Sequence, residues 1–286
     1  MTDIKLIECP RDAMQGIVPF IPTDMKVKYL NELLKVGFDT IDIGSFVSPK
    51  AIPQLADTAE VLARIDSGSS QSKLLVIVAN ERGSEEAVKQ ESVAYLGYPF
   101  SISETFQQRN TNTSIEGSWA RTANIAELAQ KAGKELVVYI SMAFGNPYGD
   151  PWNAEIALHW SERLVKELGV GIIALSDTVG VAKPADITSM FSALIPALPQ
   201  AEFGAHLHCS PDNWKQKTQA AWDGGCRRFD GAIKGYGGCP MAEDELVGNL
   251  QMELFVQDLE ARGMRTGLDL AQLERCVMEA AGVFPA

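Results

Sequence analysis

The chain has 286 residues, of which 46% are hydrophobic, and its formal net charge is -12. This acidity argues against a nucleic-acid-binding protein, which would need clustered Lys and Arg side chains. No apolar run approaches the roughly 18 residues of a membrane span. The N-terminal segment lacks the features of a secretory signal, and the five cysteines form no CxxC pair. We therefore expect reduced thiols in a cytoplasmic protein.

Short apolar runs rich in β-branched residues recur along the chain and predict eight strands. In chain order they cover residues 4–8, 38–43, 73–79, 92–98, 135–141, 170–176, 201–208 and 227–233. Amphipathic segments lie between most of them, with capping residues or Pro near their starts and Gly or Pro near their ends. The clearest predicted helices cover residues 23–37, 153–169, 183–199 and 213–225. The segment 98–115, after the fourth strand, reads as polar and irregular.

Alternating apolar strands and helices predict parallel strands that are covered by helices. A doubly wound open sheet and a (β/α)8 TIM barrel, usually of about 250 residues, both fit this alternation. Polar and Gly-rich segments follow nearly every strand, and barrels of this kind build their active sites at that end. We therefore predict a TIM barrel with a C-terminal helical extension. No break in composition divides the chain, so we expect one domain over residues 1–286.

Two of only three histidines, His206 and His208, lie at the end of the seventh predicted strand, in GAHLHC. Residues two apart in a strand point to the same face, so these imidazoles should project side by side. They could be satisfied by hydrogen bonds in the core, but in a chain so poor in histidine we favour metal ligation. The third, His159, lies in the middle of a predicted helix, where we expect a surface or packing residue.

Oxygen ligands should complete such a metal site. In a closed barrel the seventh, eighth and first strands are neighbours, so Asp12 and the loop after the eighth strand supply candidates. That loop contains Asn249 and a thiol among glycines, Cys239. An Asp, an Asn and two His suit Mg²⁺, Mn²⁺ or Co²⁺ better than a closed structural zinc site.

Several motifs together resemble the 3-hydroxy-3-methylglutaryl-CoA lyase family, in the metallolyase superfamily of TIM barrels that also contains isopropylmalate and citramalate synthases. The resemblance runs over almost the whole chain. Its motifs are CPRDAMQ (9–15), GSFVSPKAIPQLADTAEVL (44–62), SETFQQRNTNTSIE (103–116), SDTVGVAKP (176–184), HLH (206–208), GGCP (237–240) and GN (248–249). It implies a divalent cation, Mg²⁺ or Mn²⁺, held by Asp12, His206, His208 and Asn249.

The resemblance also implies that an acyl-CoA, 3-hydroxy-3-methylglutaryl-CoA, is split into acetyl-CoA and acetoacetate. The cation would lower the pKa of the 3-hydroxyl, and Arg11 would stabilise the enolate left on the acetyl-CoA fragment. Cys239 would then protonate that enolate. His206 could take the hydroxyl proton as well as bind the metal, and the sequence does not assign this base. The family resemblance suggests a homodimer.

Four further residues fall on motif positions that line the pocket of this family: Gln15, Asp42, Ser45 and Asp177. Asp177 could orient a metal-bound histidine or cap the turn that follows it. Cys9, Cys226 and Cys276 are expected to be structural.

The chain departs from the family pattern at several positions. Asp42 stands where Glu is usual, so its carboxylate should fall about 1.5 Å short, roughly one C–C bond. Residues 209–212 read CSPD instead of Asp-Thr-Tyr-Gly, and the loop after Cys239 is acidic, with Glu243, Asp244 and Glu245 that we expect to face outward. These departures leave open a lyase for another 3-hydroxyacyl-CoA, a condensing enzyme of the citramalate type, or a barrel that only binds a metal or CoA.

Overall fold

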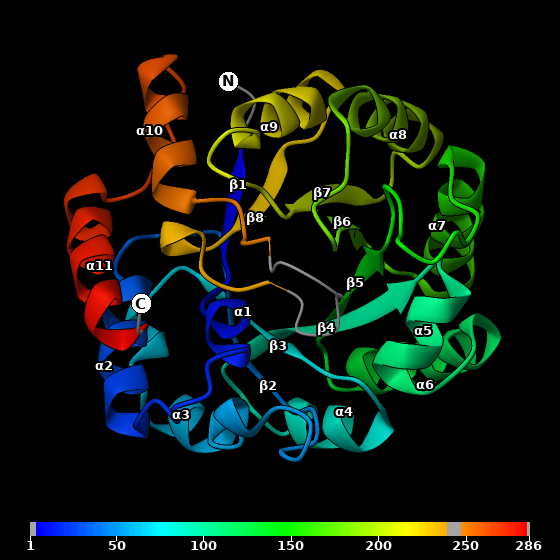
Figure 1. Ribbon diagram of the computed structural model, residues 1–286. Helices are drawn as coiled ribbons and strands as arrows, with labels where there is room; N and C mark the ends of the chain where they lie inside the picture. The colour runs from blue at the N-terminus through cyan, green and yellow to red at the C-terminus, as the bar shows by residue number, and fades with distance from the viewer. Residues whose placement is uncertain (1–3, 239–246, 285–286) are drawn as a thin grey trace.

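Eight parallel strands close into a barrel in chain order, as Figure 1 shows. The computed structural model describes residues 4–238 and 247–284, so Cys239, Glu243, Asp244 and Glu245 lie outside the described residues. The closed barrel confirms the predicted (β/α)8 fold and excludes the open sheet. Its strands are β1 (Lys5–Glu8), β2 (Thr40–Ser45), β3 (Lys73–Ile77), β4 (Val93–Ser101), β5 (Glu135–Ser141), β6 (Ile172–Asp177), β7 (Glu202–Leu207) and β8 (Arg228–Gly231).

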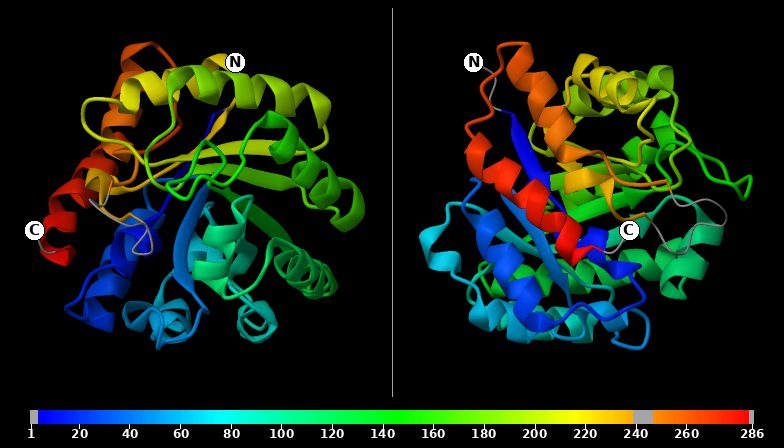
Figure 2. Two further views of the ribbon diagram at one scale, coloured as in Figure 1. Left: turned by 45° about the vertical axis from the view of Figure 1, so that its right-hand side comes forward. Right: turned by 60° about the vertical axis from the view of Figure 1, so that its left-hand side comes forward.

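Helices surround the barrel on all sides (Figures 1 and 2). They are α1 (Pro10–Gln15), α2 (Thr23–Leu34), α3 (Thr58–Arg64), α4 (Glu81–Val88), α5 (Glu104–Thr111), α6 (Ile115–Lys131), α7 (Ala154–Leu168), α8 (Pro184–Ala197), α9 (Trp214–Asp223), α10 (Met252–Ala261) and α11 (Leu270–Val283). The last of them is the predicted extension, and it packs beside α2, where the Gln272 side chain donates to the Glu32 carbonyl at 3.0 Å. Among the helices of the described segments, none is both long and apolar enough to cross a membrane.

The segment predicted to be irregular, 98–115, is regular in the structure. β4 continues to Ser101, and α5 follows it. The polar residues that suggested a loop are used as caps: the Ser103 hydroxyl accepts from the Phe106 amide at 3.1 Å. The Asp150 carboxylate in turn accepts from the Ser103 hydroxyl at 2.5 Å and from the Thr105 amide at 2.9 Å. The prediction was wrong because a capping Ser and a loop Ser look alike in one sequence.

Side chains from alternate strand positions fill the barrel interior. An apolar group that includes Leu75, Tyr95, Val137 and Ile172 packs there. Gly97 makes room for the side chains of Ile77 and Leu75, because a Cβ at this glycine would lie only 2.6 Å and 2.9 Å from them, and 3.2 Å from the ring of Tyr139. The interior therefore changes from apolar to polar toward the carboxyl ends of the strands, where Tyr139 lies edge-on to the His206 ring.

Candidate active site

A cavity of about 330 Å³ opens at the carboxyl ends of the strands. The polar residues that line it include Arg11, Asp12, Gln15, Tyr139, Ser176, Thr178, His206 and His208, and the apolar ones include Val47, Ile52, Ile77, Pro99 and Phe106. The short helix α1 begins directly after β1, with Pro at its first position, and this carries Arg11 and Asp12 onto the rim of the barrel. The cavity thus combines charged and polar groups with apolar side chains.

Three buried side chains in this cavity could hold a metal ion. One ligand atom from each of Asp12, His206 and His208 lies within 4.8 Å of the other two. Donor atoms about 2.1 Å from a shared ion lie at most about 4.2 Å apart. A divalent cation therefore fits this group after side-chain movements of less than about an ångström.

Asn249, the fourth predicted ligand, lies beside the other three. It forms an isolated antiparallel bridge with His208, and its side-chain amide donates to Asp12 Oδ2 at 2.6 Å and to the Tyr236 carbonyl at 2.9 Å. The segment after β8 is thereby tied to the end of β7. The structure brings together all four residues that the sequence predicts as ligands.

Burial and neighbouring charges shift the pKa values of this group in different directions. Burial, the nearby His206 and Lys217 lower the pKa of His208 to about 4, so its imidazole is neutral at neutral pH. Burial raises the pKa of Asp12, but Arg11 and the two histidines outweigh it and hold the pKa below its usual value. Burial lowers the pKa of His206, but its hydrogen bond to Asp230 reverses this effect and the net direction is upward.

Asp230 of β8 places a carboxylate next to the ring of His206. The sequence analysis did not predict this residue. Its Oδ2 lies 3.3 Å from His206 Nδ1, and both side chains are buried. A carboxylate in this place fixes the ring orientation and leaves the other ring nitrogen for a ligand. The available signal was an acid at an inward-facing position of an apolar strand, RRFDGAI.

Arg11 is fixed by three acceptors. Its Nε and Nη2 donate to Asp42 Oδ2 at 2.9 and 2.5 Å. Its Nη1 donates to Asp12 Oδ1 at 2.7 Å and to Gln15 Oε1 at 2.9 Å. The shorter side chain at position 42 therefore still reaches the guanidinium, but through a single oxygen. Asp42 Oδ1 is buried without a partner among the described residues, and burial raises the pKa of Asp42 to about 6.

Asp177 caps the turn that follows β6, which is one of the two roles the sequence leaves open. Its carboxylate oxygens accept from the Ala182 amide at 3.1 and 3.2 Å, and Oδ2 accepts from Lys217 Nζ at 2.6 Å. Within the described segments, Asp177 forms no hydrogen bond with a histidine side chain. Lys217, like Asp230, is a residue of this end of the barrel that the sequence analysis missed.

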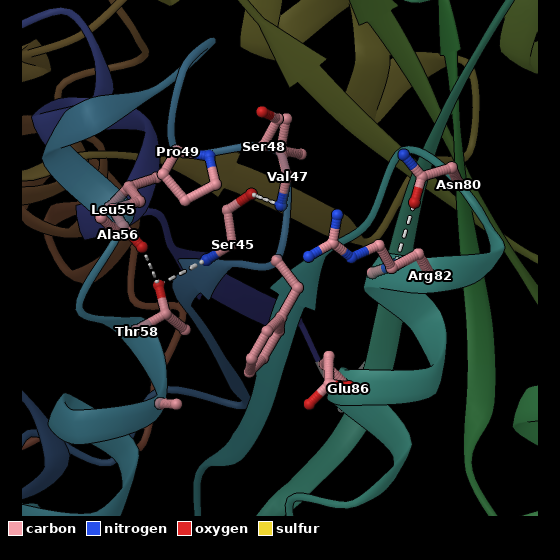
Figure 3. Close-up of a pocket in the computed structure, with 13 residues that line it drawn as sticks. Ser45, Val47, Ser48, Pro49, Leu55, Ala56, Thr58, Asn80, Arg82 and Glu86 are labelled. Carbon is pink, nitrogen blue, oxygen red and sulfur yellow. Dashed lines mark hydrogen bonds between the residues drawn. The ribbon is translucent and has the colours of Figure 1, made fainter.

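Ser45 lies in a neighbouring cavity of about 310 Å³, between the loop after β2 and the helices α3 and α4. Figure 3 shows Arg82 of α4 extending toward the loop that carries Ser45 and Val47. The Ser45 hydroxyl donates to the Ile77 carbonyl at 3.2 Å and accepts from the Val47 amide at 3.1 Å. Val47 lines both cavities, whereas Ser45 lines only this one.

Of the remaining predicted residues, Cys9 lies next to the histidine site, with its Sγ within 4.8 Å of ligand atoms of His206 and Asp230. The others do not line the cavity or lie outside the described segments. His159 is on α7, edge-on to Trp160 with ring centroids 5.2 Å apart. Cys9, Cys226 and Cys276 are buried free thiols, and burial raises the pKa of Cys226 and of Cys276 to about 12. Cys239, the predicted proton donor, lies outside the described residues.

Comparisons with known proteins agree with this geometry. The family model described as HMGL-like matches residues 4–278. The cytoplasmic 3-hydroxy-3-methylglutaryl-CoA lyase of Rattus norvegicus is 32% identical over 280 residues, 97% of this chain and 79% of the relative. A Bacillus subtilis HMG-CoA lyase structure superposes with a TM-score of 0.92 at 30% identity, covering 100% of this chain and 96% of the other. An Acinetobacter baumannii HMG-CoA lyase, solved with coenzyme A and 3-methylmalate, has a TM-score of 0.90 at 30% identity, covering 99% and 91%.

Proposed function

Because the chain belongs to the HMGL-like family, we propose that it is a lyase that cleaves 3-hydroxy-3-methylglutaryl-CoA to acetyl-CoA and acetoacetate. The observation that carries the proposal is the buried group of Asp12, His206 and His208 beside Arg11 in one cavity. This group combines imidazole and carboxylate ligands with a fixed guanidinium, which together suit the ionisation of a hydroxyl and the stabilisation of an enolate.

The proposed metal ligands are Asp12, His206, His208 and Asn249, and the proposed ion is Mg²⁺ or Mn²⁺. Such an ion, when bound, lowers the pKa of a substrate hydroxyl that it coordinates. His206 faces Asp230 through Nδ1, so a proton on its imidazole would be stabilised by that carboxylate. Since Nδ1 faces Asp230, Nε2 alone would be available, and His206 would accept the hydroxyl proton only when Nε2 does not hold the ion.

Arg11 would bind the enolate oxygen that develops on the acetyl-CoA fragment. Its guanidinium is already held by Asp42, Asp12 and Gln15, so little reorganisation would be needed as the charge forms. Cys239 would return a proton to the enolate carbon, since a thiol with an ordinary pKa near 8.5 is mostly protonated at neutral pH. Gln15 and Asp42 would act by orienting Arg11.

A second candidate is a lyase for a bulkier 3-hydroxyacyl-CoA. The observation that favours it is that apolar side chains, Ile52, Ile77 and Phe106 among them, help to line the cavity. The single-oxygen contact of Asp42 with Arg11 also favours a bulkier substrate, because a shorter side chain at position 42 leaves more room beside the guanidinium. In either case the ligand would be an acyl-CoA thioester.

The homodimer and the cytoplasmic location stay predictions. Light scattering on the purified chain tests the first, and fractionation of the source cells tests the second.

A panel of 3-hydroxyacyl-CoA thioesters, assayed with added Mg²⁺ or Mn²⁺ and again with excess chelator, tests the proposed function. We expect acetyl-CoA and acetoacetate from the 3-hydroxy-3-methylglutaryl thioester, no turnover in chelator, and recovery when the ion is returned. Longer 3-substituted glutaryl-CoA analogues in the same panel separate the two candidates. Full activity in chelator, or cleavage of no thioester with either ion, would overturn the proposal.

A further inference from the structure

Lys217 of α9 is buried at the end of the barrel that carries the site. It is 2% exposed, and its ammonium donates to Asp177 Oδ2 at 2.6 Å, to the Gly180 carbonyl at 2.9 Å and to the His208 carbonyl at 2.9 Å. An ammonium group has three donors, and all three are used. One side chain therefore links the end of β6, the turn after it and the end of β7.

The third of these contacts reaches a proposed metal ligand directly. The main chain of His208 is bridged on one side to Asn249, and the next amide, that of Cys209, donates to the Gly248 carbonyl at 2.9 Å. Lys217 holds the same short segment from the α9 side. His208 lies just beyond β7, which ends at Leu207, so these contacts replace the support that strand pairing gives to His206.

We propose that Lys217 is a positioning residue for the metal site, holding the main chain of His208 so that its imidazole faces Asp12 and His206. The inference rests on the metal site of the proposed function. It predicts that losing the ammonium weakens metal binding itself, beyond any loss of folding stability.

The chain offers a matched control in Lys26 of α2, which is also 2% exposed. Its ammonium donates to Asp57 Oδ1 at 2.7 Å and to the Gln54 carbonyl. Lys26 thus has the same kind of partners as Lys217, a carboxylate and a main-chain carbonyl, but neither partner is one of the four proposed ligands. Lys26→Met removes a buried ammonium without touching the end of β7.

Removing one partner of a buried ion pair also leaves an unpaired charge, which is strongly destabilising. Lys217→Met alone would leave the buried carboxylate of Asp177 as such an unpaired charge. The double variant Lys217→Met/Asp177→Asn removes both charges, so it should recover much of the lost stability while the His208 carbonyl still lacks its donor. Stability and metal affinity can therefore be separated.

Titration calorimetry with Mn²⁺, paired with urea unfolding, tests the inference on the full-length wild type, the two Lys→Met variants, Asp177→Asn and the double variant. We expect the Mn²⁺ Kd to rise on the order of 10- to 100-fold in Lys217→Met and to stay raised in the double variant. Lys26→Met should unfold at lower urea with an unchanged Kd.

A wild-type Kd in folded Lys217→Met, or in the double variant, would overturn the inference while leaving the proposed function intact. A wild-type chain that binds no Mn²⁺ would overturn the metal site of the proposed function and this inference with it.

Discussion

Two buried arginines lie toward opposite ends of the barrel, and their partners differ. Arg11, at the carboxyl ends of the strands, is paired with Asp12 and Asp42, whose side chains are 7% and 1% exposed. Arg228 starts β8 at the other end, and its partners are Asp39 at 3.4 Å and Glu202 at 3.1 Å, with side chains 29% and 32% exposed. Two of its nitrogens, Nε and Nη2, are buried without a partner among the described residues.

This difference separates a structural ion cluster from a functional one. The two acids that pair with Arg228 are partly exposed, although the buried Asp230 also raises the pKa of Arg228. The acids around Arg11 are desolvated, and one of them belongs to the group that could hold a metal. Burying so many charges is costly, and in barrels of this fold the carboxyl ends of the strands carry the catalytic residues. Substitutions at the two ends should therefore affect different properties.

The largest effect is expected from Arg11→Lys. Lysine keeps the charge but loses the planar group that donates to Asp42, Asp12 and Gln15 together. We expect kcat/KM to fall by an amount that corresponds to about 3 kcal/mol of lost transition-state stabilisation, which is the scale of a lost oxyanion donor. Arg228→Lys is the control, and it should lower the urea midpoint more than the turnover. Steady-state kinetics near the wild-type values in Arg11→Lys would show that Arg11 only holds structure.

A slightly smaller effect is expected from Cys239→Ser. The hydroxyl is a far weaker acid than the thiol, so kcat should fall on the order of 100-fold while KM changes little. Cys276→Ser, on α11, is the matched control and should keep the wild-type kcat. Alkylation should inactivate the wild type, and a substrate analogue should protect it. Normal turnover by Cys239→Ser would show that this thiol only packs and has no role in catalysis.

Asp42→Glu should change specificity more than rate. The longer side chain would shift the guanidinium of Arg11 or occupy part of the space beside it, since Asp42 already contacts two of its nitrogens. We expect the ratio of kcat/KM values to shift toward the 3-methyl substrate relative to longer 3-substituted glutaryl-CoA analogues. An unchanged ratio would mean that the departure from Glu at this position has no functional consequence.

The smallest effect is expected from Glu202→Gln, at the opposite end. This change weakens the contacts with Arg228 and Lys5, both of which involve a partly exposed carboxylate. We expect a loss of up to about 1 kcal/mol in the free energy of unfolding, measured in urea, with kcat and KM unchanged. A large loss of activity in this variant would contradict the division between the two ends.

The sequence predicts the barrel well because its strands are nearly continuous apolar runs and its helices carry caps at their ends. It also predicts four residues that the structure brings together, because neighbouring strands of a closed barrel place Asp12, the two histidines and Asn249 at one end. Lys217 was missed because lysine in a helix is usually exposed. The available signal was its position three residues after Trp214, on the buried face of α9.

Ser45 shows that a motif can suggest a pocket residue without telling which cavity that residue lines. Its motif position suggested a place in the pocket, but its hydroxyl is used by the main chain of Ile77 and Val47. Which of two adjacent cavities a strand-end residue faces depends on the local turn, and a motif does not encode that turn.

Anomalous scattering from crystals of the protein grown with Mn²⁺ tests the central claim most directly. We predict one strong peak at the carboxyl ends of the strands, about 2.1 Å from donor atoms of Asp12, His206, His208 and Asn249. In His208→Ala crystals grown in the same way, the peak should be lost or much weakened. A strong peak elsewhere, or none at these four residues in the wild type, would contradict the account.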